Sequence, residues 1–150
     1  MKKQILFLVL GTMLGLPLFA LVRPRSADGP VLAPEPQLQT AGKQDLLVVE
    51  SPAINERIMS PVLVRGRARG FWFFEASFPV KILDKNGEVL GSGIAEAQSE
   101  WMTENFVPFR AVISFQPTES ETGTLVLEKD NPSGLPEHAD ELRMPIRFFR

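Results

Sequence analysis

Three segments hold most of the residues that could bind a partner or do chemistry. They are residues 65–75, 100–109 and 128–137, which read RGRARGFWFFE, EWMTENFVPF and EKDNPSGLPE. Together they combine arginines, tryptophans and carboxylates, and Trp and Arg are the residues most enriched at the energetic centres of protein interfaces. These residue types favour recognition of a partner over covalent chemistry.

Few of the groups that catalysis needs are present in the sequence. The chain has no cysteine and a single histidine, His138, which excludes disulfides, thiolate nucleophiles and multi-histidine metal centres. There is no Ser-His-Asp order with a workable spacing and no phosphate-binding glycine loop. A pair of carboxylates would suit glycoside hydrolysis, but a sequence does not give the distance between them. We therefore expect a protein without enzymatic activity, cofactor or metal.

The aromatic and charged positions of the three segments define a predicted binding surface. In a strand, the run 71–74 would place two rings on each face, so one pair enters the core. The other pair is either covered by residues 101–109 or exposed for recognition. Arg65, Arg67 and Arg69 would share one face, and we expect them to pair with loop carboxylates, with binding of an anion as the alternative. The predicted binding residues are Arg67, Arg69, Trp72, Glu75, Trp101, Glu104, Asp130 and Asn131.

Composition excludes two broad classes of protein. Sixteen Lys and Arg against eighteen Asp and Glu give a net charge of −2, which argues against nucleic acid as a partner. With 44% hydrophobic and 23% charged residues, the chain is neither disordered throughout nor an integral membrane protein throughout.

The sequence predicts three regions. Lys2 and Lys3 precede an apolar run up to residue 22, so residues 1–22 are expected to form an apolar helix that is a signal peptide or an N-terminal membrane anchor. Residues 23–45 contain four prolines and are expected to be a flexible linker. Residues 46–150 are expected to form one folded domain outside the cytoplasmic membrane.

The folded domain is predicted to be all-β. About seven short strands are expected at 46–50, 61–65, 78–82, 88–90, 109–115, 123–128 and 142–148. Asn86-Gly87 predicts a hairpin with a type I′ turn, and the strands at 109–115 and 123–128 are expected to pair. Pro145 indicates an edge position or a bulge. This pattern is typical of an immunoglobulin-like β-sandwich.

A family resemblance supports the same fold. Residues 66–79, 101–109 and 127–136 (GRARGFWFFEASFP, WMTENFVPF and LEKDNPSGLP) resemble the immunoglobulin-like domain of bacterial spore germination and sporulation proteins. The resemblance covers roughly residues 46–149. It implies a non-catalytic β-sandwich outside the cytoplasm.

The sequence therefore predicts an exported binding or adaptor module that presents an aromatic and charged loop surface to an envelope protein. The alternative is a module that binds cell-wall glycan, because aromatic rings stack on sugars and carboxylates accept hydrogen bonds from their hydroxyl groups. The expected partners are an envelope protein or cell-wall glycan, and the membrane through the N-terminal segment.

Overall fold

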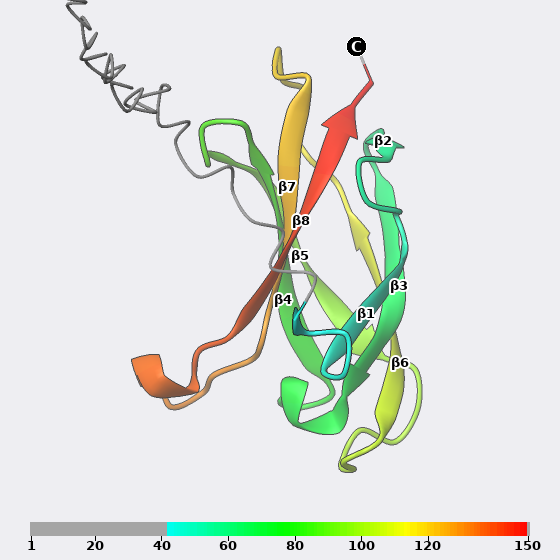
Figure 1. The fold of residues 1–150 in the computed structure, drawn as a ribbon, viewed down its shortest axis with the longest axis vertical. Helices are drawn as coiled ribbons and strands as arrows, with labels where there is room; N and C mark the ends of the chain where they lie inside the picture. The colour runs from blue at the N-terminus through cyan, green and yellow to red at the C-terminus, as the bar shows by residue number, and fades with distance from the viewer. Residues whose placement is uncertain (1–41, 150) are drawn as a thin grey trace, which may run out of the picture. The chain divides into compact units, whose positions relative to one another are not determined.

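The computed structural model describes residues 42–149, which form strands and loops almost throughout (Figure 1). The eight strands are β1 (Leu47–Ser51), β2 (Arg57–Ile58), β3 (Val62–Arg69), β4 (Ser77–Asp84), β5 (Val89–Ala97), β6 (Phe106–Ile113), β7 (Thr122–Glu128) and β8 (Glu141–Phe148). Two short 3-10 helices are η2 (Gly70–Trp72) and η3 (Pro136–His138). The predicted all-β class is confirmed. The helix predicted within residues 1–22 lies outside the described residues, as does the predicted linker up to residue 41.

The eight strands form one continuous, curled sheet in the order β1-β3-β6-β5-β4-β7-β8-β2. Its edge strands, β1 and β2, follow each other in the chain, so a short connection links the two edges. The orders β1-β3-β6-β5 and β4-β7-β8 match the A-B-E-D and C-F-G orders of immunoglobulin constant-type domains. Here hydrogen bonding between β4 and β5 joins the two halves into a single sheet.

Two details of the predicted strands are wrong. Strand β2 was not expected, because two residues are too few to show an alternating pattern. The segments around 109–115 and 123–128 do not pair with each other. Strand β6 pairs with β3 and β5, whereas β7 pairs with β4 and β8 in the other half of the sheet. Consecutive strands were assumed to be neighbours, but the connection between β6 and β7 crosses from one half to the other.

The core lies inside the curl of the sheet. Strand β3 alternates buried and exposed residues along nearly its whole length, as do β6 and β8, which is the period of two expected for strands with one solvated face. The largest fully buried side chains are Trp72, Phe78, Phe109, Leu47, Ile82, Ile113, Leu125, Leu127, Leu142, Met144, Ile146 and Val64. This core supports the loops at both ends of the strands.

The hairpin between β4 and β5 confirms the turn predicted at Asn86-Gly87 but not its type. Gly87 has φ +86°, and its amide donates to the carbonyl of Asp84 at 3.2 Å, whereas Asn86 is not among the residues with positive φ. A type I′ turn needs positive φ at both central residues. A three-residue loop that ends in a left-handed glycine, with a register shift near Leu83, fits these values.

Asp84 holds this hairpin through its carboxylate. Desolvation by burial raises the pKa of Asp84, but the amides of Glu88 and Asn86 (2.9 and 2.7 Å), the side chain of Asn86 and the hydroxyl of Ser120 donate to the carboxylate. These hydrogen bonds outweigh the desolvation, so the pKa lies below its ordinary value.

We predict that Asp84→Asn lowers the stability of the domain at pH 7. We also expect the variant to lose less stability than the wild type as the pH falls below about 4. Because the folded pKa is lower than the unfolded one, the ionised carboxylate stabilises the fold above about pH 4. That contribution is lost as the pH falls from about 4 through the folded pKa. Urea midpoints of both proteins between pH 7 and pH 3 test this. A variant curve parallel to the wild-type curve would contradict it.

Candidate binding surface

Three loops gather at one end of the sheet, the lower end in Figure 1. They are residues 70–76 between β3 and β4, residues 98–105 between β5 and β6, and residues 129–140 between β7 and β8. We call them together the loop end. It contains six of the predicted binding residues, namely Trp72, Glu75, Trp101, Glu104, Asp130 and Asn131. The three sequence segments that resemble the family thus meet in space.

The first loop begins with the 3-10 helix η2, which changes how the aromatic run is presented. Trp72 and Phe73 are buried, whereas Phe71 and Phe74 are 50% and 42% exposed. The expected alternation of a strand is therefore wrong here. Phe71 lies within η2, whereas the backbone is extended again at Phe73 (φ −88°, ψ 150°) and Phe74 forms a β-bridge with Ser77. This change of backbone conformation leaves both Phe71 and Phe74 facing solvent.

Trp72, predicted to contact a partner, lies in the core instead. Its side chain has no exposed surface, and it joins the same buried cluster as Phe73, Phe78 and Phe109. The ring of Phe78 meets those of Phe73 and Phe109 edge-to-face, with centroids 5.1 and 5.0 Å apart. No group among residues 42–149 accepts a hydrogen bond from the Trp72 indole N–H, so the burial of this side chain rests on packing. This anchor fixes the path of the first loop.

The second loop packs directly against Gly70. The Gly70 amide donates to the carbonyl of Asn105 at 3.1 Å. A Cβ at this position would lie 1.9 Å from the carbonyl oxygen of Thr103 and 2.3 Å from that of Trp101. Only glycine allows this approach. Trp101 is half-buried against the core, Glu104 is exposed, and the neighbouring Met102 is 73% exposed.

The third loop is tied to the first through Trp72. The Asp130 amide donates to the Trp72 carbonyl at 3.1 Å. Asn131 closes the loop on itself, because its side-chain amide donates to the Leu135 carbonyl at 2.8 Å and its oxygen accepts from Ser133. Asp130 and Asn131 are both half-buried, and Asn131 holds loop geometry in this structure.

A tight turn at Glu75-Ala76 ends the first loop. Both residues have positive φ, 47° and 61°, and Phe74 and Ser77 exchange backbone hydrogen bonds of 3.0 Å across them. Two left-handed residues between such a pair fit a type I′ turn, which strongly prefers Asn-Gly. Backbone strain of this kind persists where the surroundings impose it and is often found at functional sites. The turn leaves Glu75 exposed beside Phe74.

Within the described part of the chain, the arginines of β3 form no ion pair with a carboxylate, contrary to the internal pairing that was expected. Within residues 42–149 the ion pairs are Lys43–Asp140, Lys81–Glu128 and Arg143–Glu141. Arg69 instead donates to the carbonyls of Asp45 and Glu104 at 2.8 and 3.2 Å. Arg67 is exposed on the outer face of β3. The guanidinium carbons of Arg67 and Arg69 lie 5.5 and 4.2 Å from the centroid of the Phe106 ring.

Sequence reasoning missed the exposed apolar residues of the loop end. Phe71, Phe74, Met102 and Leu135 are all more than 40% exposed. No local pattern indicates the exposure of Phe71 and Phe74, because it depends on the change from the 3-10 turn to extended backbone at Phe73. Around them the loop end has six carboxylates and one lysine, Lys129. The surface is therefore apolar in part and acidic in charge.

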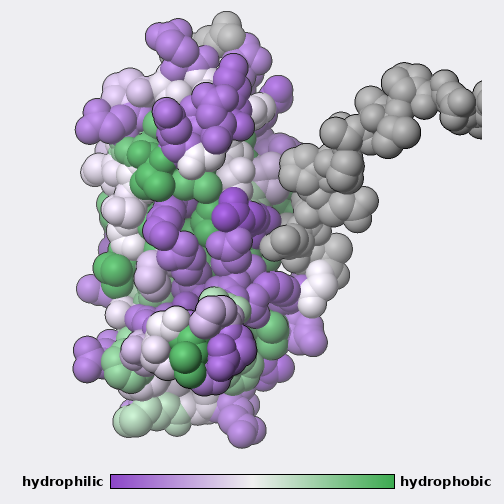
Figure 2. All heavy atoms as spheres, turned by 90° about the vertical axis from the view of Figure 1, so that its left-hand side faces the viewer, coloured by the Kyte–Doolittle hydropathy of each residue, from purple (hydrophilic) through white to green (hydrophobic). Residues whose placement is uncertain are grey.

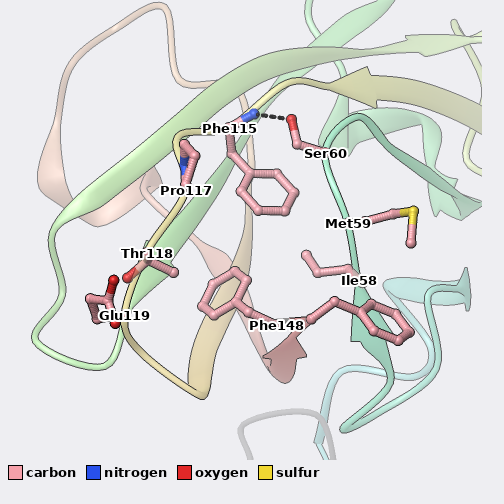
Figure 3. Close-up of a pocket in the computed structure, with 9 residues that line it drawn as sticks. Ile58, Met59, Ser60, Phe115, Pro117, Thr118, Glu119 and Phe148 are labelled. Carbon is pink, nitrogen blue, oxygen red and sulfur yellow. Dashed lines mark hydrogen bonds between the residues drawn. The ribbon is translucent and has the colours of Figure 1, made fainter.

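Hollows occur at both ends of the sheet. One of about 630 Å³ is lined by Asp130 and Asn131 of the third loop together with Lys43 and other polar residues. A cavity of about 380 Å³ at the opposite end, near β2, is lined mainly by apolar side chains such as Ile58, Phe115 and Phe148 (Figure 3). Figure 2 shows one side of the molecule, where small hydrophobic areas are separated by hydrophilic residues. Residues 42–149 contain no cluster of three metal-ligating side chains. Nor does that part of the chain include a helix long and apolar enough to cross a membrane.

Comparison with known families identifies the class of protein. The model of the immunoglobulin-like domain of bacterial spore germination matches residues 46–134, more than half of the chain. The chain belongs to this family, so the resemblance is confirmed. Membership indicates a non-catalytic binding module of an extracytoplasmic protein. Searches of curated proteins and of solved structures give no significant match.

We predict that Ala76→Gly stabilises the domain by about 1 kcal/mol. A left-handed non-glycine residue costs roughly 1–2 kcal/mol, part of which is offset by the greater chain entropy of glycine in the unfolded state. The thermal midpoint should rise by about 4 °C. Ala53→Gly is a matched control at an exposed position without positive φ, and it should not raise the midpoint. An unchanged or lower midpoint for Ala76→Gly would show that the turn is unstrained.

Proposed function

We propose that this chain is an exported, non-catalytic adaptor of the bacterial cell envelope that binds a partner protein through its loop end. Residues 1–22 act as the signal peptide or membrane anchor in this proposal, and residues 23–45 act as the flexible linker. The folded domain then reaches its partner outside the cytoplasmic membrane. Family membership supports the module, and the geometry of the loop end supports the surface.

One observation carries the proposal. Phe71, Phe74 and Met102 are exposed on loops whose backbones are fixed by Gly70 and Trp72. Large apolar side chains on an ordered surface are typical of interface centres, because little conformational entropy is lost when they bind. Exposed apolar side chains also occur on the faces of the strands, but those side chains do not lie on loops whose backbones are held together.

The negative charge of the loop end indicates which kind of partner surface it favours. Exposed carboxylates, among them Glu75, Glu100 and Glu104, surround the apolar side chains. Electrostatic complementarity favours a partner with an apolar site bordered by Lys and Arg. The acidic rim affects the association rate and its salt dependence more than the final affinity.

Cell-wall glycan is the second candidate partner. Sugar binding by stacking needs exposed aromatic faces, and the buried Trp72 offers none. The half-buried Trp101 and the exposed Phe71 and Phe74 are the rings that could serve. We rank the protein partner above glycan on this ground, and the experiment below separates them.

We predict that Phe71→Ser/Phe74→Ser in the tagged full-length protein abolishes capture of the envelope partner. The expected loss is at least about tenfold, because two interface anchors are removed. Ile94→Ser/Val112→Ser is the matched control, since it removes two side chains of similar exposure from β5 and β6. Capture is measured by cross-linking in the native envelope followed by mass spectrometry.

Both variants should keep the wild-type thermal midpoint within a few degrees, because each changes exposed side chains. Co-sedimentation with purified cell walls is measured in parallel. Equal capture by the wild type and the Phe71→Ser/Phe74→Ser variant would refute the proposed surface. If no protein partner is captured and the Phe71→Ser/Phe74→Ser variant no longer sediments with cell walls, the loop end binds glycan instead of a protein.

A further inference from the structure

A second surface lies on the outer face of β3 and β6. Four arginines lie on it, namely Arg65, Arg67, Arg69 and Arg110. We call it the arginine face. Arg65, Arg67 and Arg110 are exposed, and Arg69 is half-buried. None of the four forms an ion pair within residues 42–149.

The arrangement of these arginines costs stability. Arg65 lies directly opposite Arg110 on the neighbouring strand. Side chains at such positions are about 5 Å apart at Cβ, and like charges there repel each other. Two exposed carboxylates flank this pair, Glu50 at the irregularity of β1 beside Arg65 and Glu96 opposite Arg110 on β5. Neither forms an ion pair with these arginines within residues 42–149, so they offset the repulsion only in part. The sequence analysis assigned Arg67 and Arg69 to the predicted binding surface, but it did not indicate that Arg110 lies on the same face.

Phe106 orders part of the arginine face. Both Arg67 and Arg69 lie over its ring, and Arg69 is also held by two backbone carbonyls. Cation–π contacts restrict a guanidinium without neutralising its charge. The face therefore keeps positive charge in fixed positions, which lowers the entropy that an anionic ligand must overcome on binding.

The spacing of the arginines fits a linear anion better than a small one. Arg65, Arg67 and Arg69 follow each other at intervals of two residues, which is roughly 6.7 Å along a strand. The face is the surface of a sheet, so a single small anion would remain in contact with water. A chain with phosphodiester groups at a similar repeat would contact several guanidinium groups at once, and each link raises the effective concentration of the next group.

We propose that the arginine face binds a linear polymer of polyol phosphates, a phosphodiester chain that carries no bases. This inference does not rest on the loop end, because the two surfaces use different residues and carry opposite charge. A single polymer chain would lie along β3, with Arg110 contacting it from β6.

The proposal is tested with a fluorescent poly(glycerol phosphate) oligomer titrated against the full-length protein in detergent. Arg65→Gln/Arg110→Gln should weaken binding about tenfold at about 50 mM salt, because two charge-assisted contacts are lost. The slope of log K against log salt should become shallower by about 1.4. Glu96→Gln should tighten binding, since it removes a carboxylate beside Arg110.

Lys85→Gln/Arg147→Gln is the matched control, because it removes the same charge from exposed positions outside the arginine face. It should change the affinity less than twofold. Thermal midpoints check the fold, and Arg65→Gln/Arg110→Gln should be at least as stable as the wild type, because the repulsion is relieved.

Three results would overturn the inference. One is the absence of binding by the wild type, and another is an equal loss in the control variant. The third is arginine-dependent binding to vesicles of anionic phospholipid without binding to the free polymer, which would assign the face to a membrane surface. The loop-end proposal survives each of these results, because its test measures a protein partner and changes Phe71 and Phe74.

Discussion

The burial of Trp72 within a single 3-10 turn is the constraint on which the loop end depends. The turn starts at Gly70, whose contact with Thr103 and Trp101 leaves no room for a side chain. It ends at Trp72, whose ring lies in the core and whose carbonyl accepts from the Asp130 amide. One turn of backbone thus joins three loops that are far apart in the sequence. Without the buried indole, the loops would lose their shared support.

The same turn decides which aromatic side chains are available to a partner. Because the backbone changes from the 3-10 turn to an extended conformation at Phe73, Phe71 and Phe74 are exposed while the two rings between them are buried. The loop then returns to β4 through the strained turn at Glu75 and Ala76. The positive φ angles of Glu75 and Ala76 lower the stability of the folded domain, and the turn holds Phe74 and Glu75 at the tip of the first loop. Left-handed backbone and exposed apolar side chains are both features that occur often at binding sites.

Sequence reasoning captured the parts of the fold that depend on local pattern. Alternation along β8 and the glycine of the β4–β5 hairpin are local properties, so both could be located in advance. The partners of β6 and β7 depend on which half of the sheet each strand joins, and no local pattern records that. Burial of Trp72 was undecidable for a similar reason, because it depends on contacts with distant loops. Among the residues that the structure describes, Arg65 and Arg67 also lack ion pairs, and this depends on their spatial distance to carboxylates.

The central claim is that the loop end, and not a strand face, contacts the partner. A photo-reactive phenylalanine analogue placed at position 71 in the full-length protein tests it most directly, with the same analogue at position 94 as the comparison. Both positions are about half exposed, so they differ in location more than in access. The account predicts a discrete protein adduct from position 71 in the native envelope and none from position 94. An adduct from position 94 alone would contradict it.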